Sequence, residues 1–152
     1  MKSSPKRPVP LPDAIAHHTG IVLYKVAQYV QERLDQTLLS RGFKTRHYSV
    51  LGVLAHAGPM SQQAIAGILR IDRAIMVAIV DDLERLGLVE RRRNAHDRRL
   101  NDLTLTEAGH ATLREADALL EAMERETFSP LSEPEQRELH DLLSRLLVWP
   151  AD

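Results

Sequence analysis

The sequence predicts a mainly α-helical fold with one small β-hairpin, and three observations support that fold class. Apolar residues recur at spacings of three, four and seven along most of the chain, which is the period of a helix with one buried face. Ser, Thr or Asp precedes most of these segments, and these residues begin helices because their side chains accept from free backbone N–H groups. Only the stretch after Gly87 changes to the alternation typical of strands.

The length and the apolar content are those of one ordinary domain. The chain has 152 residues, of which 43% are hydrophobic and 27% charged, enough for a core beneath a hydrated surface. Residues 1–12 combine three basic residues with four prolines. Because proline removes amide donors and resists regular structure, we expect a flexible basic arm there, and a solvated tail is favoured over contact with phosphates.

Four helices are expected before the hairpin. The first runs from Asp13 to Ser40, which is long for a small domain, so part of its apolar stripe should pack on something outside the domain. The next three are shorter and cover residues 45–56, 61–70 and 72–86.

The ends of the third and fourth helices carry strong local signals. Ser61 and Asp72 are the expected N-caps, and the third helix should break around Arg70. Gly87 supplies a left-handed residue at the end of the fourth helix, and Leu88 is placed for the contact of a Schellman-type cap.

The hairpin and two final helices complete the expected plan. Two short strands at 88–92 and 101–105 flank the charged link 93–100, which is longer than the usual hairpin loop of about two to five residues. Thr106 is expected to begin a helix that reaches Thr127, and Ser132 is expected to begin the last helix.

The charge is balanced overall but unevenly distributed. The formal net charge is −1, which by itself argues against a nucleic-acid-binding chain. Residues 1–105 hold 16 Lys and Arg against 10 Asp and Glu, whereas residues 106–152 hold 4 against 11. Such asymmetry is typical of a region that binds a polyanion joined to a region that does not.

Composition and motifs exclude several classes of function. The chain has no cysteine, which excludes disulfides, thiolate metal sites and thiol nucleophiles within it and fits a cytoplasmic protein. No apolar run approaches the roughly 18 residues that span a bilayer, and we do not expect residues 1–12 to be a secretory signal, because no apolar segment follows their basic residues. We find no nucleophile elbow, phosphate-binding Gly loop or His-Glu-x-x-His spacing, so we expect neither an enzyme nor a metal or cofactor site.

The order of a short capped helix, a tight turn, a second capped helix and a basic hairpin predicts a winged helix-turn-helix. The second helix of such a pair fits the major groove, while the first crosses the backbone. The N-termini at Ser61 and Asp72 favour phosphate. Arginine suits phosphate forks and the narrow minor groove, and the hairpin carries five arginines: Arg91, Arg92, Arg93, Arg98 and Arg99.

Four short motifs occur in order between residues 61 and 110. They are Ser61-Gln62-Gln63 through Asp72-Arg73, Leu83-Glu84-Arg85-Leu86-Gly87-Leu88-Val89-Glu90-Arg91, Asp97-Arg98-Arg99, and Leu103-Thr104-Leu105-Thr106-Glu107-Ala108-Gly109. Each motif is moderately specific, but the ordered set resembles the MarR family of bacterial transcription regulators. The long first helix and the two final helices also follow the family's order.

The resemblance implies a homodimer on a pseudo-palindromic operator in double-stranded DNA, with DNA binding often weakened by a small molecule. It implies a dimerisation helix at 13–44, a DNA-binding lobe at 45–105 and dimerisation helices at 106–152. In the family's wing, the residue matching Asp97 holds the one matching Arg99 in place for the minor groove. The alternative for these two residues is a surface ion pair, worth about 0–1 kcal/mol.

The recognition helix departs from the family pattern of Ser, Thr and Arg. This chain has Ala74, Ile75, Val77 and Ala78 there, and apolar side chains can contact a thymine methyl but cannot read donors and acceptors. Our hypothesis is that the wing and DNA shape contribute more affinity than base readout. The expected DNA contacts are Ser61, Gln62, Arg73, Ala74, Met76, Arg91, Arg92, Arg93, Asp97, Arg98 and Arg99.

Polar and aromatic residues on the first two helices admit two interpretations. The family's ligand pocket lies between the dimer layer and the DNA-binding lobe, where His, Tyr and Arg would suit a small aromatic or phenolic anion. The alternative is that these are interface and surface residues with satisfied polar tips. The residues concerned are His17, Tyr24, Arg46, His47 and Tyr48.

The last helix carries a continuous apolar stripe. In a chain with only 4% aromatic residues, such a stripe is not expected to stay exposed to water. We expect it to bury against a second subunit. The expected dimer contacts are Ile15, Leu139, Leu142, Leu143, Leu146 and Trp149. A second class of function remains open, namely a helical dimer that binds a small molecule or a protein but not specific DNA.

Overall fold

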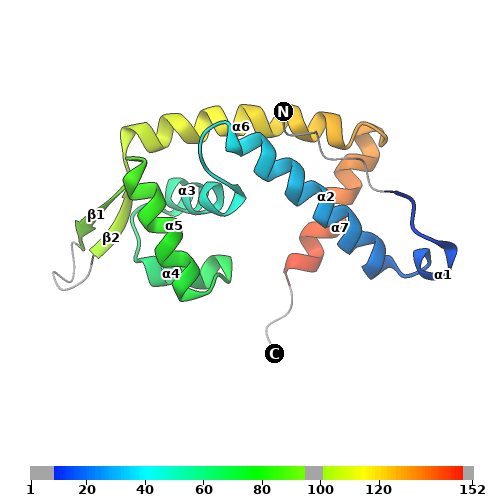
Figure 1. The fold of residues 1–152 in the computed structure, drawn as a ribbon, viewed down its shortest axis with the longest axis horizontal. Helices are drawn as coiled ribbons and strands as arrows, with labels where there is room; N and C mark the ends of the chain where they lie inside the picture. Colours follow the sequence, from blue (N-terminus) through cyan, green and yellow to red (C-terminus); the bar gives the residue numbers. More distant parts are fainter. Residues whose placement is uncertain (1–8, 95–100, 149–152) are drawn as a thin grey trace.

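The computed structural model describes residues 9–94 and 101–148, and it is an elongated arrangement of helices (Figure 1). A long helix runs along one side and joins a compact lobe at one end to the first and last helices at the other. The elements in chain order are α1 (Asp13–Ala16), α2 (Thr19–Leu39), α3 (Thr45–Ala57), α4 (Gln62–Leu69), α5 (Arg73–Arg85), β1 (Val89–Arg93), β2 (Asn101–Leu105), α6 (Glu107–Thr127) and α7 (Glu133–Leu147). The predicted mainly α-helical fold with one hairpin is confirmed.

The helices of the lobe begin where their capping residues predict. The Ser61 hydroxyl accepts from the Ala64 N–H at 3.2 Å and begins α4. The Asp72 carboxylate accepts from the Ala74 N–H at 2.8 Å and begins α5. Each cap satisfies a backbone donor that has no partner within its own helix.

Both helices of this pair also end in a Schellman motif. At the end of α5, Gly87 has a φ of +71°, and the Leu88 N–H reaches back to the Leu83 carbonyl at 2.9 Å. At the end of α4, Arg70 takes the left-handed position with a φ of 49°, and the Ile71 N–H donates to the Ala66 carbonyl at 3.0 Å. The predicted break at Arg70 and the predicted cap at Gly87 are confirmed.

The hairpin is antiparallel, with Val89 opposite Leu105 and Arg93 opposite Asn101. Its base is fixed to the lobe by the segment between α3 and α4. The Leu103 N–H donates to the Met60 carbonyl at 2.9 Å, and the Met60 N–H donates back to Leu103 at 3.3 Å. This bridge gives β2 a backbone partner on its second edge, so the base of the wing is part of the lobe.

One hydrophobic core joins the lobe to the long helix. It draws on α3, α4, α5, the hairpin and α6, so the helix-turn-helix and α6 form one body. The buried apolar residues are Leu38, Phe43, Val50, Leu51, Leu54, Ile65, Met76, Ile79, Val80, Leu83, Leu88, Val89, Leu103, Leu105, Leu113, Ala116, Leu120 and Met123.

The junction between the hairpin and α6 requires a residue without a side chain. Thr106 caps α6 by accepting from the Gly109 N–H at 3.0 Å, and its hydroxyl donates to the Gly87 carbonyl at 2.6 Å. A Cβ built on Gly109 would clash with the Leu88 carbonyl oxygen. The first turn of α6 can therefore approach the start of β1 only with glycine at this position.

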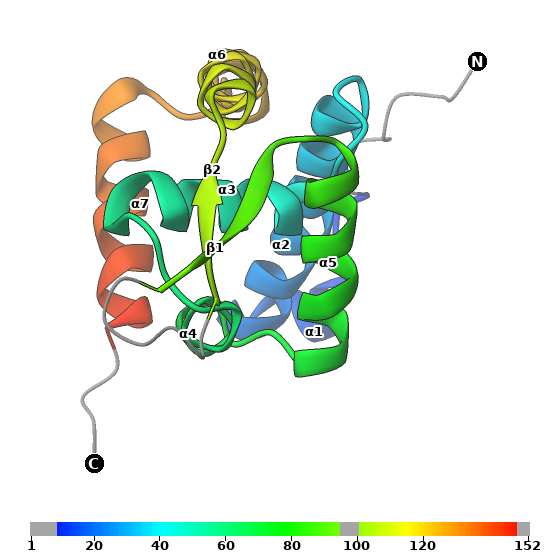
Figure 2. The ribbon, with the colours of Figure 1, turned by 90° about the vertical axis from the view of Figure 1, so that its left-hand side faces the viewer.

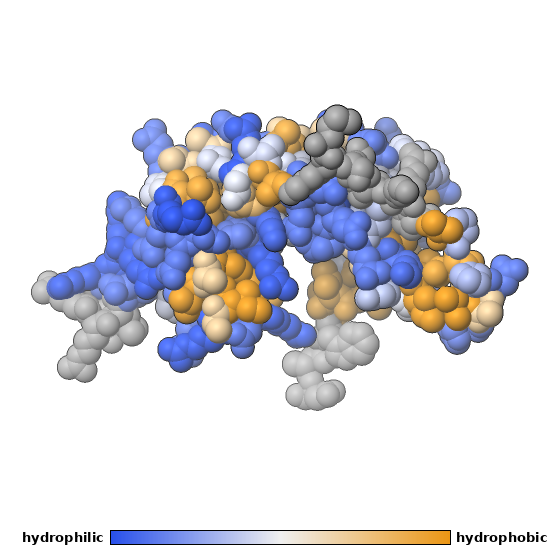
Figure 3. Space-filling view, in the orientation of Figure 1, coloured by the Kyte–Doolittle hydropathy of each residue, from blue (hydrophilic) through white to orange (hydrophobic). Residues whose placement is uncertain are grey.

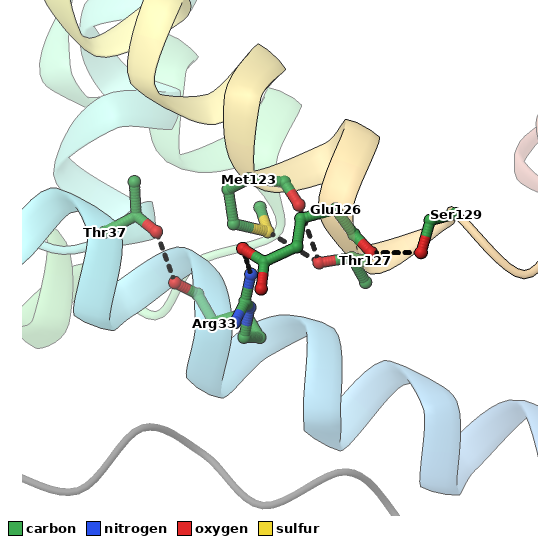
Figure 4. Close-up of polar contacts among 6 residues, drawn as sticks. All are labelled: Arg33, Thr37, Met123, Glu126, Thr127 and Ser129. Carbon is green, nitrogen blue, oxygen red and sulfur yellow. Dashed lines mark hydrogen bonds and ion pairs between the residues drawn. The ribbon is translucent and has the colours of Figure 1, made fainter.

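A polar contact fixes α2 to the far half of α6 (Figure 4). The Arg33 guanidinium donates to the Glu126 carboxylate at 2.6 Å, and its side chain is only 14% exposed. Thr37, one turn later on α2, donates to the Arg33 carbonyl at 2.8 Å. Together with buried Met123 beside it, this contact sets where the two helices cross.

The predicted single helix from Asp13 to Ser40 is wrong at its N-terminal end. The chain forms the short α1, and His18 then adopts an extended conformation with a ψ of 106° before α2 begins. No residue of α1 is buried, so no tertiary packing compensates the low helix propensity of His, Thr and Gly in this stretch.

The helix α7 has no buried residue in the single chain. Figure 2 shows it on the opposite side of the molecule from α5, connected through the end of α6. Figure 3 shows apolar side chains gathered over α4 and α5 and over the α1 end of the molecule. In the part of the chain that the structure describes, no helix is long and apolar enough to cross a membrane.

Candidate nucleic-acid interface

The helices α4 and α5 each begin at a side-chain N-cap, Ser61 and Asp72. Arg70 and Ile71 form the tight turn between these helices, and Asp72 then caps α5. A hollow between the two helices is lined by Gln62 and Gln63 from α4 and by Arg73 and Val77 from α5. Of the predicted contacts, Ser61 and Gln62 thus lie at the start of α4, and Arg73 and Ala74 lie exposed at the start of α5.

The helix α5 has one buried and one exposed face. Ile79, Val80 and Leu83 point into the core, and so does Met76, which is fully buried. The prediction that Met76 faces the groove is therefore wrong, because at about 3.6 residues per turn it lies on the same side as the other three. The outer face of the first turns is small and apolar, and it consists of Ala74, Val77 and Ala78.

The carboxylate of Asp82 has cationic and imidazole partners within the chain. Arg85 donates to one of its oxygens, and His47 Nε2 lies 3.3 Å from the other. These hydrogen bonds, that from Arg85 first, lower the pKa of Asp82 below its usual value. The side chain thus lies toward α3, and its negative charge is partly offset by these neighbours.

His47 connects the start of α3 to the recognition helix. Its Nδ1 accepts from the Lys44 N–H at 3.2 Å, so in the neutral ring the proton lies on Nε2 and is donated to Asp82. Both ring nitrogens therefore have partners within the chain, and the side chain is only 13% exposed.

Among the described wing arginines, Arg91 and Arg92 have partners within the chain. Arg91 donates to Glu84 at 3.0 Å and to Asp81 at 3.3 Å, both on α5. Arg92 donates to Glu90 at 2.7 Å on the other face of the hairpin. Because side chains alternate along a strand, Arg91 faces α5 with Val89 while Arg92 faces away.

The remaining predicted wing residues are of two kinds. Arg93 is exposed at the end of β1, and no carboxylate pairs with it in the described part of the chain. Asp97, Arg98 and Arg99 lie outside the described residues. The wing can thus offer its cations to a polyanion beside the exposed face of α5, with Arg91 helping to hold the two elements together.

The five residues predicted for a ligand pocket do not share a cavity in one chain. Arg46 lines a hollow of about 490 Å³ between α2, α3 and the turn before α5. His47 points to α5, and Tyr48 donates to Asp117 on α6 at 2.6 Å. Neighbouring helical residues point about 100° apart, so these three cannot face one site. His17, just after α1, and Tyr24 on α2 are exposed.

The predicted dimer residues remain exposed or half-buried in the single chain. Leu142 and Leu146 are 48% and 57% exposed, and Ile15 on α1 is 38% exposed. Leu139 and Leu143 line a groove between α6 and α7. Trp149 lies outside the described residues. Among residues 9–94 and 101–148, no group of three or more side chains could hold a metal ion.

The partners that orient these residues were not predicted from the sequence. Asp81 and Glu84 hold Arg91, and Asp35 on α2 accepts from the N–H and hydroxyl of Thr45 at 2.9 and 2.8 Å. Acidic residues seven and ten positions from a basic one, like Glu84 and Asp81 before Arg91, are visible in a sequence. Which acid meets which base depends on the angle between α5 and the hairpin, which periodicity does not give.

Comparisons with known proteins agree on one family. A profile of the MarR family matches residues 41–100. The HTH-type transcriptional regulator BilQ of Clostridium symbiosum is 30% identical over 131 residues, which cover 86% of this chain and 88% of the relative.

Solved structures of the family have the same fold over nearly the whole chain. A MarR-family regulator from Rhodococcus sp. RHA1 gives a TM-score of 0.81 at 26% identity, covering 92% of this chain and 100% of the other. CouR from Rhodococcus jostii RHA1, solved bound to p-coumaroyl-CoA, gives 0.78 at 27% identity, covering 93% and 99%. The chain with the capped helix pair and the arginine-bearing hairpin belongs to the MarR family of transcriptional regulators.

Proposed function

We propose that this chain is a DNA-binding transcriptional repressor that acts as a homodimer on a pseudo-palindromic operator. One observation carries the proposal. The exposed face of α5, the N-terminus of α4 and the arginine-bearing hairpin belong to one body with a common core. A major-groove helix and a wing that follows the adjacent backbone need this fixed relationship.

The distribution of charge supports the orientation of the lobe toward DNA. The excess of basic residues lies in residues 1–105, which contain the helix pair and the hairpin, whereas α6 and α7 carry the acidic excess. Phosphates would attract the lobe and repel the acidic helices, so the field of the molecule favours one approach. We place its action in the cytoplasm, where a bacterial regulator meets DNA, and assign it no reaction.

The exposed apolar faces support a dimer. In the single chain, water is in contact with the apolar side chains of Leu142 and Leu146 on α7 and of Ile15 on α1. A second copy of the chain that packed on them would remove this apolar surface from water. In such a dimer the two copies of α5 would lie about 34 Å apart, one turn of duplex.

A small aromatic or phenolic anion is the effector that we propose for release from DNA. The hollow that holds Arg46 also has Arg70 on its wall and reaches the N-terminus of α5 at Asp72. Its volume of about 490 Å³ lies within the range of about 300–1,000 Å³ seen for small-molecule sites. A ligand that pairs with either arginine would press on the turn that positions the recognition helix.

Binding to DNA selected from a random pool tests the proposal. We expect specific sequences with two half-sites and an affinity that falls steeply with salt, because several phosphates are neutralised. Arg93→Ala should lower the salt dependence by about one phosphate contact. Arg137→Ala on α7 serves as the matched control and should change nothing.

Two outcomes would contradict the proposal. Absence of salt-dependent DNA binding would favour the second class, a helical dimer that binds a small molecule or a protein. Losses of about 1–3 kcal/mol for each substituted base pair in the major groove would contradict the hypothesis that the wing and DNA shape contribute more affinity than base readout.

A further inference from the structure

The outer face of α5 is a stripe that offers no hydrogen bond to a base. Ala74, Val77 and Ala78 are all exposed there, and none has a polar side-chain atom. Positions 74 and 78 lie one turn apart, with Val77 beside them, so their methyl groups form a continuous surface of about one turn. We call these three residues the methyl stripe.

The carboxylates beyond the methyl stripe have partners within the chain. Asp81 and Glu84 accept from Arg91 of the hairpin, and Asp82 accepts from Arg85 and His47. Asp72, before the stripe, is occupied in capping the backbone N–H groups of Ala74 and Ile75. Negative charge beside the stripe is therefore partly neutralised, which lets this part of α5 approach a polyanion.

The surroundings of the methyl stripe are those of a nucleic-acid interface. Arg73 and the α5 N-terminus stand at one end, and the hollow shared with Gln62 and Gln63 of α4 adjoins Val77. A helix N-terminus favours phosphate, and Arg73 is long enough to reach a phosphate or a guanine edge. These cationic and polar neighbours make DNA the occupant that fits the stripe, in place of an apolar protein surface.

Only one group in the major groove matches a surface of methyl groups. Thymine carries a C5 methyl there, whereas the other edges offer donors and acceptors that the stripe cannot pair. We propose that Ala74, Val77 and Ala78 select operator half-sites by contact with thymine methyl groups. The inference rests on the proposed function and adds the chemical feature that α5 reads.

Replacing thymine by deoxyuridine in the selected half-site isolates this contact. The replacement removes only the C5 methyl and keeps the pairing with adenine, the minor-groove edge and the phosphates. We expect the affinity to fall about four-fold for each methyl that loses its contact, the value for burial of one carbon group. The dependence of affinity on salt should stay unchanged, because no phosphate contact is altered.

A pair of protein variants assigns the effect to the methyl stripe. Val77→Thr keeps the branched shape but replaces one methyl by a hydroxyl, and it should reduce the ratio of affinities for thymine and deoxyuridine duplexes. Ile68→Thr on α4 is the control, because Ile68 is also an exposed apolar residue, 58% exposed against 42% for Val77, but does not line the hollow beside the methyl stripe. The control should keep the full ratio.

The outcomes separate this inference from the proposed function. Salt-dependent binding with equal affinity for both duplexes would overturn the inference and leave the proposed function intact. An unchanged ratio in Val77→Thr would overturn the assignment to α5. No binding to either duplex would overturn the proposed function as well, and capture of a protein by the stripe would then be the expected alternative.

Discussion

The phenol of Tyr48 on α3 donates a hydrogen bond of 2.6 Å to the carboxylate of Asp117 on α6. These residues are 69 positions apart, and their contact links the DNA-binding lobe to the helix that connects it with the dimer helices. Partial burial and this hydrogen bond raise the pKa of Tyr48 to about 12. The neutral phenol is therefore the form that the fold favours.

Tyr48→Phe should destabilise the protein by about 1 kcal/mol, because Asp117 loses its donor. The pKa in the folded state lies above the usual value of 10.0, so the contribution of Tyr48 is present below pH 10 and is lost as the pH rises toward 12. A titration of tyrosinate absorbance against pH checks this. The ionisation step near pH 12 should be absent in Tyr48→Phe. In Asp117→Asn, which keeps an acceptor without the charge, that step should move toward lower pH; an unmoved step would contradict the account.

Asp35→Ala should cost about 0.5–2 kcal/mol, because Asp35 caps the start of α3 from a neighbouring helix. Partial burial raises the pKa of Asp35, but the hydrogen bonds from Thr45 outweigh it and hold the pKa below the usual 3.8. The stabilisation is thus present above pH 3.8 and is lost as the pH falls through the lower, folded-state pKa. Denaturant unfolding at several pH values measures both effects, and Asp35→Asn should retain the cap while losing this pH dependence.

Arg91→Ala should weaken DNA binding by leaving Asp81 and Glu84 unpaired beside the phosphates. Adding Glu84→Gln to that variant should restore part of the affinity, because one of the two carboxylates is then removed. Each exposed ion pair is worth about 0–1 kcal/mol. The DNA affinities of the two single variants and the double variant should therefore be compared at low salt, as a double-mutant cycle. An additive cycle, with no recovery in the double variant, would show that Arg91 does not shield α5.

Leu146→Asp should dissociate the dimer, because it places a charge on the apolar face of α7 that we expect to be buried against the second subunit. Sedimentation velocity should show a monomer, and operator affinity should fall with the loss of the second half-site. Arg137→Ala, whose exposed partner Glu133 lies on the same helix, is the control and should remain dimeric. A dimeric Leu146→Asp would place the subunit contact elsewhere.

The sequence by itself determined the elements with local causes. Ser61, Asp72 and Thr106 cap helices through contacts within three residues, and Gly87 ends α5 through its own backbone conformation. These interactions need no distant part of the chain, so the helix pair and the hairpin could be predicted along with the family they resemble. Exposure of Ala74 and Arg73 also followed from the period of one helix.

The tertiary structure decided which faces meet and which charges pair. Met76 lies in the core, His47 meets α5, Tyr48 meets α6, and Arg91 faces α5. A helical period gives the direction of a side chain about its own axis, but its partner depends on how that axis crosses others. The separation of α1 from α2 has the same cause. A stretch of low helix propensity stays helical only when it packs on another part of the protein, and no residue of α1 is buried.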